Sequence, residues 1–220
     1  MDTYSLIKLI HLLGFCYWLG GDIGVFYSSG FVVRDDLSRE QRLMAGRIML
    51  ALDLIPRICM SITLTVAALL ASQLKLALAP GELFILILLG PLWLALVLVL
   101  HFRHAAASGI LVSVDKLLRW TVIGAILIYV ANAWFADELA PPPWLLLKLL
   151  GFAVLVFLGL LIRAGFGGFA AGYAALLKDH PDALENAAMQ SSLSRVRPLV
   201  LAIWTILIFE AYLGIAKPYW

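Results

Sequence analysis

The sequence has little charge for its length: Asp, Glu, Lys and Arg together make up only 14% of its 220 residues. Ordinary soluble domains carry about 25% charged residues, so the composition excludes a mainly soluble protein. Hydrophobic residues account for 63% of the chain, which predicts an integral membrane protein with membrane lipid as its surroundings. The net charge is only +2, and we expect no nucleic-acid partner.

Cysteine is also scarce, with Cys16 and Cys59 as the two examples. Both lie inside expected helices and form no C-x-x-C motif, so we interpret them as small buried residues and not as a disulfide or metal pair. The five methionines form no M-x-x-M cluster. The small number of methionines weighs against a copper-handling protein.

Long apolar runs dominate the chain. A helix needs about 20 mostly apolar residues to cross a bilayer, and the runs lack the alternation of a membrane β-barrel. The connections are short, so we predict an all-α, six-helix membrane bundle that forms a single transmembrane domain over residues 1–220. The first run has no basic n-region and no A-x-A-like site, unlike a cleaved signal peptide. The expected spans are approximately 5–32, 46–73, 82–104, 118–137, 144–176 and 198–217.

Basic residues between the spans predict the orientation. Most fall on one side of the arrangement and few on the other, and the richer side is cytoplasmic by the positive-inside rule. The N-terminus and the C-terminus then both lie outside, which requires an even number of spans. We also expect Arg39 and Arg42 to be surface residues. The richer side holds Arg34, Arg39, Arg42, Arg47, Arg103, Lys116, Arg119, Lys178, Arg195 and Arg197, and the other holds Lys8, Lys75, Lys148 and Lys217.

His11 is the most informative polar residue, because it interrupts the apolar run YSLIKLIHLLGFCYWLGG. At about 100° per residue, His11, Trp18 and Asp22 fall on one stripe of the first helix. Ionisable groups inside a membrane are functional candidates by default. A neutral imidazole is a good axial ligand for heme iron. We therefore predict that His11 ligates a heme iron and that Trp18 packs against the bound ring.

Arg57 is the second polar feature within the apolar runs. We place it on the second helix at the depth of Asp22, and Asp53 lies four residues earlier on the same face. An unpaired Arg at that depth is costly, so we expect an Asp22–Arg57–Asp53 network. The network either clamps the two helices together or uses Arg57 to hold an anionic group such as a heme propionate or a semiquinone. Arg57 and Asp22 are therefore candidate catalytic residues.

Lys148 lies near the outer end of the fifth span. It either snorkels to the interface or faces inward, where it would contact the heme or a substrate carboxylate as a cofactor-binding and catalytic residue. Glu210 on the last span should face the bundle, where it could pair with Lys148 or transfer protons.

His101 and His104 are three residues apart and share one face of the third span. They either cap the helix end or form a metal pair. Their depth puts them about 25 Å from His11, so they cannot share its iron. With no second histidine at the depth of His11, a heme iron there is five-coordinate or has a non-histidine second ligand.

Two segments carry a family resemblance. The first span has an aromatic residue, then Lys, His, Trp and Gly, and the segment WLLLKLL at 144–150 has a W-L-x-x-K pattern that points to Lys148. Both resemble the membrane protoporphyrinogen IX oxidase family and its relatives in the copper-resistance D superfamily. The first motif consists of Tyr4, Lys8, His11, Trp18 and Gly20.

The resemblance implies a heme b bound by His11 with Lys148 close by, and redox chemistry in the bacterial inner (plasma) membrane. The chain departs from the family by two additional spans between the second helix and the W-L-x-x-K helix. It also lacks the basic C-terminal part of the oxidase. Heme binding therefore follows from the resemblance more directly than the oxidase reaction does.

The leading hypothesis is a heme b-containing membrane oxidoreductase that exchanges electrons with quinone or a porphyrin-like substrate. The alternative is a copper-handling or small-solute transport protein that uses His11, Met60 and the His101/His104 pair as stations. A third possibility is a structural subunit of a respiratory complex. The small-residue run RAGFGGFAAGYAA at 163–175 offers a face for a homodimer.

Overall fold

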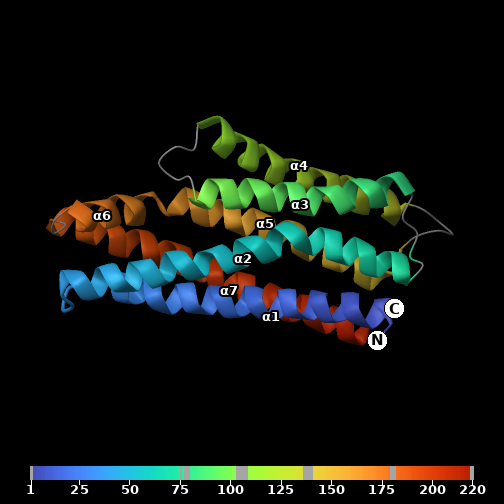
Figure 1. Ribbon diagram of the computed structural model, residues 1–220, viewed down its shortest axis with the longest axis horizontal. Helices are drawn as coiled ribbons and strands as arrows, with labels where there is room; N and C mark the ends of the chain where they lie inside the picture. The colour runs from blue at the N-terminus through green and yellow to red at the C-terminus, as the bar shows by residue number, and fades with distance from the viewer. Residues whose placement is uncertain are drawn as a thin grey trace.

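The computed structural model describes residues 2–74, 76, 80–102, 109–135, 141–178 and 182–218. Within these ranges the regular secondary structure is entirely α-helical, which confirms the predicted all-α class for the described chain (Figure 1). The helices are α1 (Thr3–Val32), α2 (Arg39–Gln73), α3 (Pro80–Phe102), α4 (Gly109–Trp134), α5 (Pro143–Gly165), α6 (Gly167–Lys178) and α7 (Ala183–Ala216).

Five helices, α1, α2, α3, α5 and α7, are long and apolar enough to cross a membrane. The chain therefore has the character of a multi-pass helical membrane protein. The 26-residue α4 is not among the five, and it carries Asp115, Lys116 and Arg119 in its first half. The count of six spans stays a prediction.

The predicted span 144–176 is wrong as a single helix, because α5 ends at Gly165 and α6 begins at Gly167. Glycine is a poor helix former, and three glycines surround Phe166, so the chain leaves the helix there. The glycines of this run also pack within the chain: a Cβ on Gly168 would lie 2.9 Å from Ala188 O, and one on Gly172 would lie 2.9 Å from Met189 Cβ. They bring α6 close to α7, and the homodimer face stays a prediction.

Three helices begin well before the predicted apolar spans, and one of them, α4, begins at Gly109 and not at 118. α2 begins at Arg39 behind a capping box of Ser38 and Gln41, and α7 begins at Ala183 behind a capping box of Asp182 and Glu185. Each capping box satisfies free N–H groups of the first turn. The predicted starts at 46 and 198 therefore mark where the apolar part of each helix begins, and not where the helix begins.

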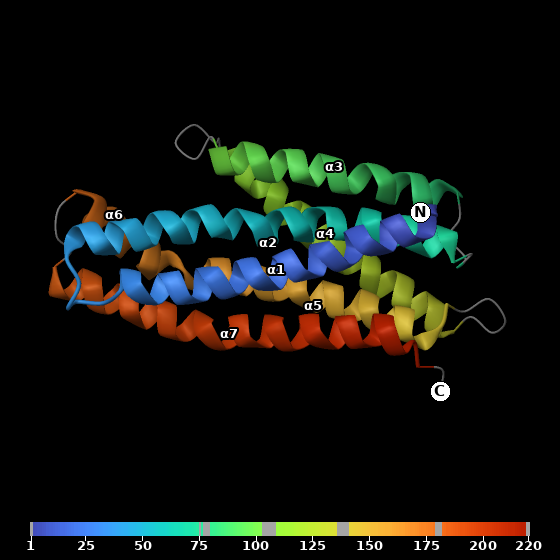
Figure 2. The same cartoon turned by 60° about the horizontal axis from the view of Figure 1, so that its bottom comes forward.

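The bundle brings both ends of the chain to the same end of the molecule, opposite α6 and the turn from α1 to α2 (Figure 1, Figure 2). α2 packs between α1 and α3, while α5 contacts both α4 and α7. α1 and α2 approach closely at Gly21, where a Cβ would lie only 2.8 Å from Pro56 Cδ. This crossing fixes the level at which Asp22 meets α2.

Arginine side chains tie the helices together at the end opposite the termini. Arg39 donates to Leu176 O at 3.0 Å and to Leu177 O at 2.8 Å, at the C-terminal end of α6. Arg42 is buried, and it donates to Val32 O at 2.7 Å and to Asn186 Oδ1 at 2.6 Å. The prediction that Arg42 is a surface residue is therefore wrong, whereas Arg39 is half-buried and serves carbonyl groups at the end of α6, which need donors.

Candidate intramembrane polar site

α5 and α7 bring Lys148 and Glu210 together, and His11 of α1 lies within electrostatic range of Lys148. Lys148 Nζ on α5 donates to Glu210 O on α7 at 2.6 Å and lies 3.4 Å from Glu210 Oε2. The Lys148 and Glu210 side chains are only 19% and 13% exposed. His11 on α1 is half-buried and close enough to Lys148 to interact with its charge. Lys148 therefore faces the bundle and pairs with Glu210, and it does not snorkel to the interface.

Two glycines make room for this ion pair. A side chain at Gly151 on α5 would collide with Glu210 Oε1, and a Cβ at Gly214 on α7 would lie 3.4 Å from Lys148 Nζ. Each helix thus presents a glycine to the charged residue of the other. Glu210 Oε1 is buried without a hydrogen-bond partner among the described residues. A buried acceptor of this kind is costly, so it is ready to receive a donor.

Trp18 and Asp22 occupy the same stripe of α1 as His11, deeper in the bundle. Trp18 is 6% exposed and meets the Phe152 ring of α5 edge-on, with 6.4 Å between ring centroids. Asp22 is half-buried and close enough to Asp53 and Cys59 to interact electrostatically with both. The predicted stripe therefore faces α2 and α5.

Arg57 forms an ion pair with Asp53 one turn earlier on α2, as predicted from their spacing. The two side chains are 31% and 30% exposed. Asp22 lies within electrostatic range of Asp53 where α1 crosses α2, and the Asp22–Arg57 part of the network stays a prediction. Whether Arg57 also holds an anionic ligand stays a prediction.

A second buried network centres on Asp115 of α4, which is fully buried. Its carboxylate accepts hydrogen bonds from Trp93 Nε1 at 3.2 Å, Arg119 Nε at 2.9 Å and Arg163 Nη1 at 2.6 Å. Arg119 is 2% exposed. Arg119 is therefore paired inside the protein and is not a charge exposed on the cytoplasmic side.

Sequence reasoning missed this network although a signal was available. Asp115 and Arg119 have the same D-x-x-x-R spacing as Asp53 and Arg57, which places acid and base on one helix face. Arg119 also donates to Met60 Sδ on α2 at 3.2 Å. The network joins α2, α3, α4 and α5.

The structure describes some of the predicted metal-binding residues and not others. Among the residues that the structure describes, no group of three or more His, Cys, Asp or Glu side chains could hold a metal ion. His101 lies at the end of α3 with its ring 5.0 Å from that of Phe102, whereas His104 lies outside the described residues.

His11 fits heme chemically, because a neutral imidazole is a good axial ligand for iron, whereas Lys148 is a cation paired with Glu210 and gives no lone pair to a metal. Neither of the two described cavities includes His11 in its lining, although the second lies beside it between α1 and α2, against Ile10, Leu13 and Gly14. His11 is partly exposed, so a large planar ring would have to reach it from the outside of the bundle. The fit therefore rests on the chemistry of the imidazole and on access, and not on a ready-made pocket.

No family model matches the chain, and no curated protein or solved structure matches it either. The relation to the oxidase and the copper-resistance D superfamily therefore stays a prediction from the motifs of α1 and α5.

Proposed function

We propose that this protein is a heme b-containing oxidoreductase of the bacterial inner (plasma) membrane that exchanges electrons with quinone or a porphyrin-like substrate. The observation that carries the proposal is the convergence of His11, Lys148 and Glu210 from α1, α5 and α7. The same residues, His11 and Lys148, carry the resemblance to heme-binding families.

The charge balance of the cluster supports a ligand role for His11. Lys148 and Glu210 neutralise each other at 3.4 Å, so a structural clamp would be complete without a third ionisable group. A neutral imidazole beside this pair adds a metal ligand and no charge. The cluster therefore has a component that helix packing does not require.

Each residue has a defined task in the proposal. His11 would hold the iron through an imidazole nitrogen, and Glu210 would position the Lys148 ammonium beside it. Arg57 would offer a positive charge to a heme propionate. When bound, heme b supplies one-electron redox chemistry.

Absorption spectroscopy of the purified protein tests this function. With heme supplied during expression, we expect a Soret band, b-type α and β bands, and a pyridine hemochrome ratio near one heme per chain. His11→Ala should abolish or shift the Soret band while the protein stays monodisperse. His101→Ala is the matched control and should keep both spectrum and heme content. A heme-free wild type, or an unchanged spectrum in His11→Ala, would overturn the proposal.

The copper-handling alternative has less support. Met60, one of its expected stations, accepts a hydrogen bond from Arg119 through its sulfur, so its thioether is already engaged. Metal analysis of the same preparation separates the two functions, because bound copper without heme would favour the alternative.

For the topology, we propose that α4 crosses the membrane in addition to the five apolar helices and that both termini lie outside. The shared end of the two termini supports an even number of crossings (Figure 1).

A further inference from the structure

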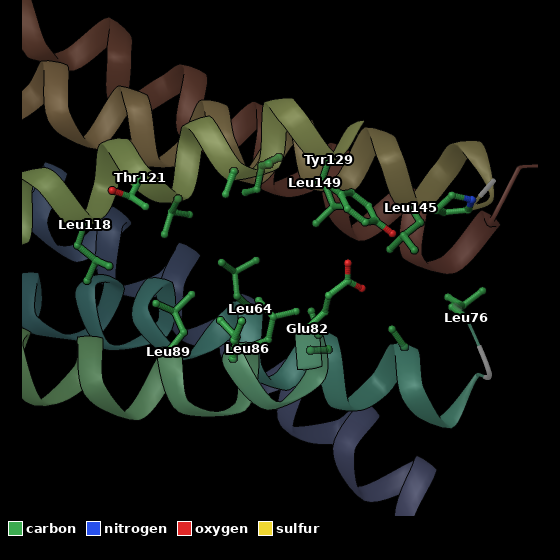
Figure 3. A pocket seen from close by; sticks show the side chains of 18 residues that line it. Leu64, Leu76, Glu82, Leu86, Leu89, Leu118, Thr121, Tyr129, Leu145 and Leu149 are labelled. Atoms are coloured by element: carbon green, nitrogen blue, oxygen red, sulfur yellow. The ribbon is translucent and has the colours of Figure 1, made fainter. Parts of the chain in front are cut away.

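A cavity of about 380 Å³ lies between α2, α3, α4 and α5, near the end of the bundle that holds the termini (Figure 3). Its wall is almost entirely aliphatic, with leucine, isoleucine, valine and alanine side chains. α3 and α4, which form much of it, are the two helices that the family motifs leave without a counterpart. Small-molecule sites are typically apolar clefts of roughly 300–1,000 Å³ with a few placed polar groups.

Two polar groups face one another across this cavity. The Glu82 carboxylate from α3 and the Tyr129 phenol from α4 point toward each other (Figure 3), close enough to interact electrostatically. The Thr121 hydroxyl lies further along α4. None of the described lining residues carries a positive charge. The cavity therefore suits a neutral ligand with hydrogen-bonding oxygens, and it disfavours the carboxylate of a fatty acid or the phosphate of a phospholipid.

The cavity reaches the surface between α3 and α4. Ile85 is 64% exposed, and Thr121 and Ala125 are also exposed although they line it. On a membrane-spanning bundle this surface faces lipid, so a ligand can enter sideways and leave an apolar tail outside. Leu145 and Leu149 extend the wall onto α5, the helix that also carries Lys148.

We propose that this cavity binds the ring of a lipid-soluble quinone or quinol. The ring is neutral and flat, and its two oxygens accept from Tyr129 as carbonyls or donate to Glu82 as hydroxyls. Its isoprenoid tail leaves through the opening between α3 and α4. The inference deepens the proposed function by placing the electron partner next to α5, but the binding itself does not require heme.

Equilibrium binding of decylubiquinone to the full chain in lipid nanodiscs tests the site. We expect saturable binding to the wild type, weakened about three- to tenfold in Tyr129→Phe through loss of one hydrogen bond. Ala125→Phe, which fills the opening, should weaken binding at least tenfold. The matched controls are Tyr27→Phe and Ala131→Phe, which alter exposed positions on α1 and α4 outside the cavity. Both should bind as the wild type does.

Each outcome has a defined meaning. The absence of saturable binding, or equal binding in Ala125→Phe and Ala131→Phe, would overturn the proposal. Tighter binding of dodecanoate than of decylubiquinone would also overturn it, because the charge argument would then be wrong. Heme content is measured on the same samples. A heme-free protein that binds quinone through this cavity supports the inference while defeating the proposed function, and a heme-loaded protein without quinone binding does the reverse.

Discussion

Asp115 joins three helices through side-chain hydrogen bonds in the interior of the bundle. Its fully buried carboxylate receives two guanidinium groups and an indole N–H from three helices. Removing one partner of a buried ion pair leaves an uncompensated charge, which costs about 3–5 kcal/mol. Single residues of this kind set the stability of the bundle.

We therefore predict that Asp115→Asn lowers the free energy of unfolding by about 3–5 kcal/mol, measured by denaturant titration in detergent. Asp36→Asn is the control, because Asp36 pairs with Arg34 at the surface. The hydrogen bond from Arg34 lowers the pKa of Asp36, but exposed pairs contribute little, so stability should hardly change. Equal effects of the two variants would contradict the burial argument.

A second residue-scale prediction concerns Lys148. Lys148→Met leaves the Glu210 carboxylate buried without its cation, so we expect a lower yield of folded protein. Lys148→Met combined with Glu210→Gln removes both charges and should restore the yield. If Lys148 also positions the heme, the Soret maximum of the rescued double variant differs from that of the wild type. An unchanged spectrum would show that the Lys148–Glu210 pair only joins α5 to α7 and does not position heme.

At the scale of helices, the crossing of α1 and α2 depends on one of two adjacent glycines. A Cβ on Gly21 would lie 2.8 Å from the stiff ring of Pro56, whereas one on Gly20 meets nothing within 4 Å. We predict that Gly21→Ala lowers the melting temperature in detergent, at a cost of about 1–3 kcal/mol for overpacking. Gly20→Ala should be nearly silent. Equal melting temperatures would show that α1 shifts freely on α2.

The positions of the helices could be predicted from the sequence in part, whereas some of their ends could not. Apolar runs located the membrane-type segments, because burial in lipid demands them. They missed the polar starts of α2 and α7, whose capping boxes lie outside any apolar window, and the break at Phe166, where three glycines interrupt an apolar run.

The candidate site was predictable in part for similar reasons. The Asp53–Arg57 pair follows from helix spacing. The contact between Lys148 and Glu210 joins residues 62 positions apart, so the sequence could only offer it as one of several options. The Asp115 network was not predicted, because basic residues near helix ends such as Arg119 are typical of the cytoplasmic side of a membrane protein. Their sequence positions do not distinguish an exposed arginine from a buried one.

For the whole molecule, we predict that both termini lie outside the cytoplasm. Alkaline phosphatase fused after Trp220 should be active, and green fluorescent protein at the same position should be dark. Fusions after Asp36, in the turn between α1 and α2, should give the opposite pattern. Activity of the C-terminal fusion only in the cytoplasm would contradict both the charge bias and the even number of crossings.

The meeting of His11, Lys148 and Glu210 also has a consequence for biosynthesis. These residues belong to α1, α5 and α7, so the ribosome has to make α7 before the cluster can exist. α1 is therefore in the bilayer before α7, and the His11 imidazole lies there without the Lys148–Glu210 pair until α7 has been inserted. A chain released before α7 would insert its early helices and still lack the carboxylate that holds Lys148 in place.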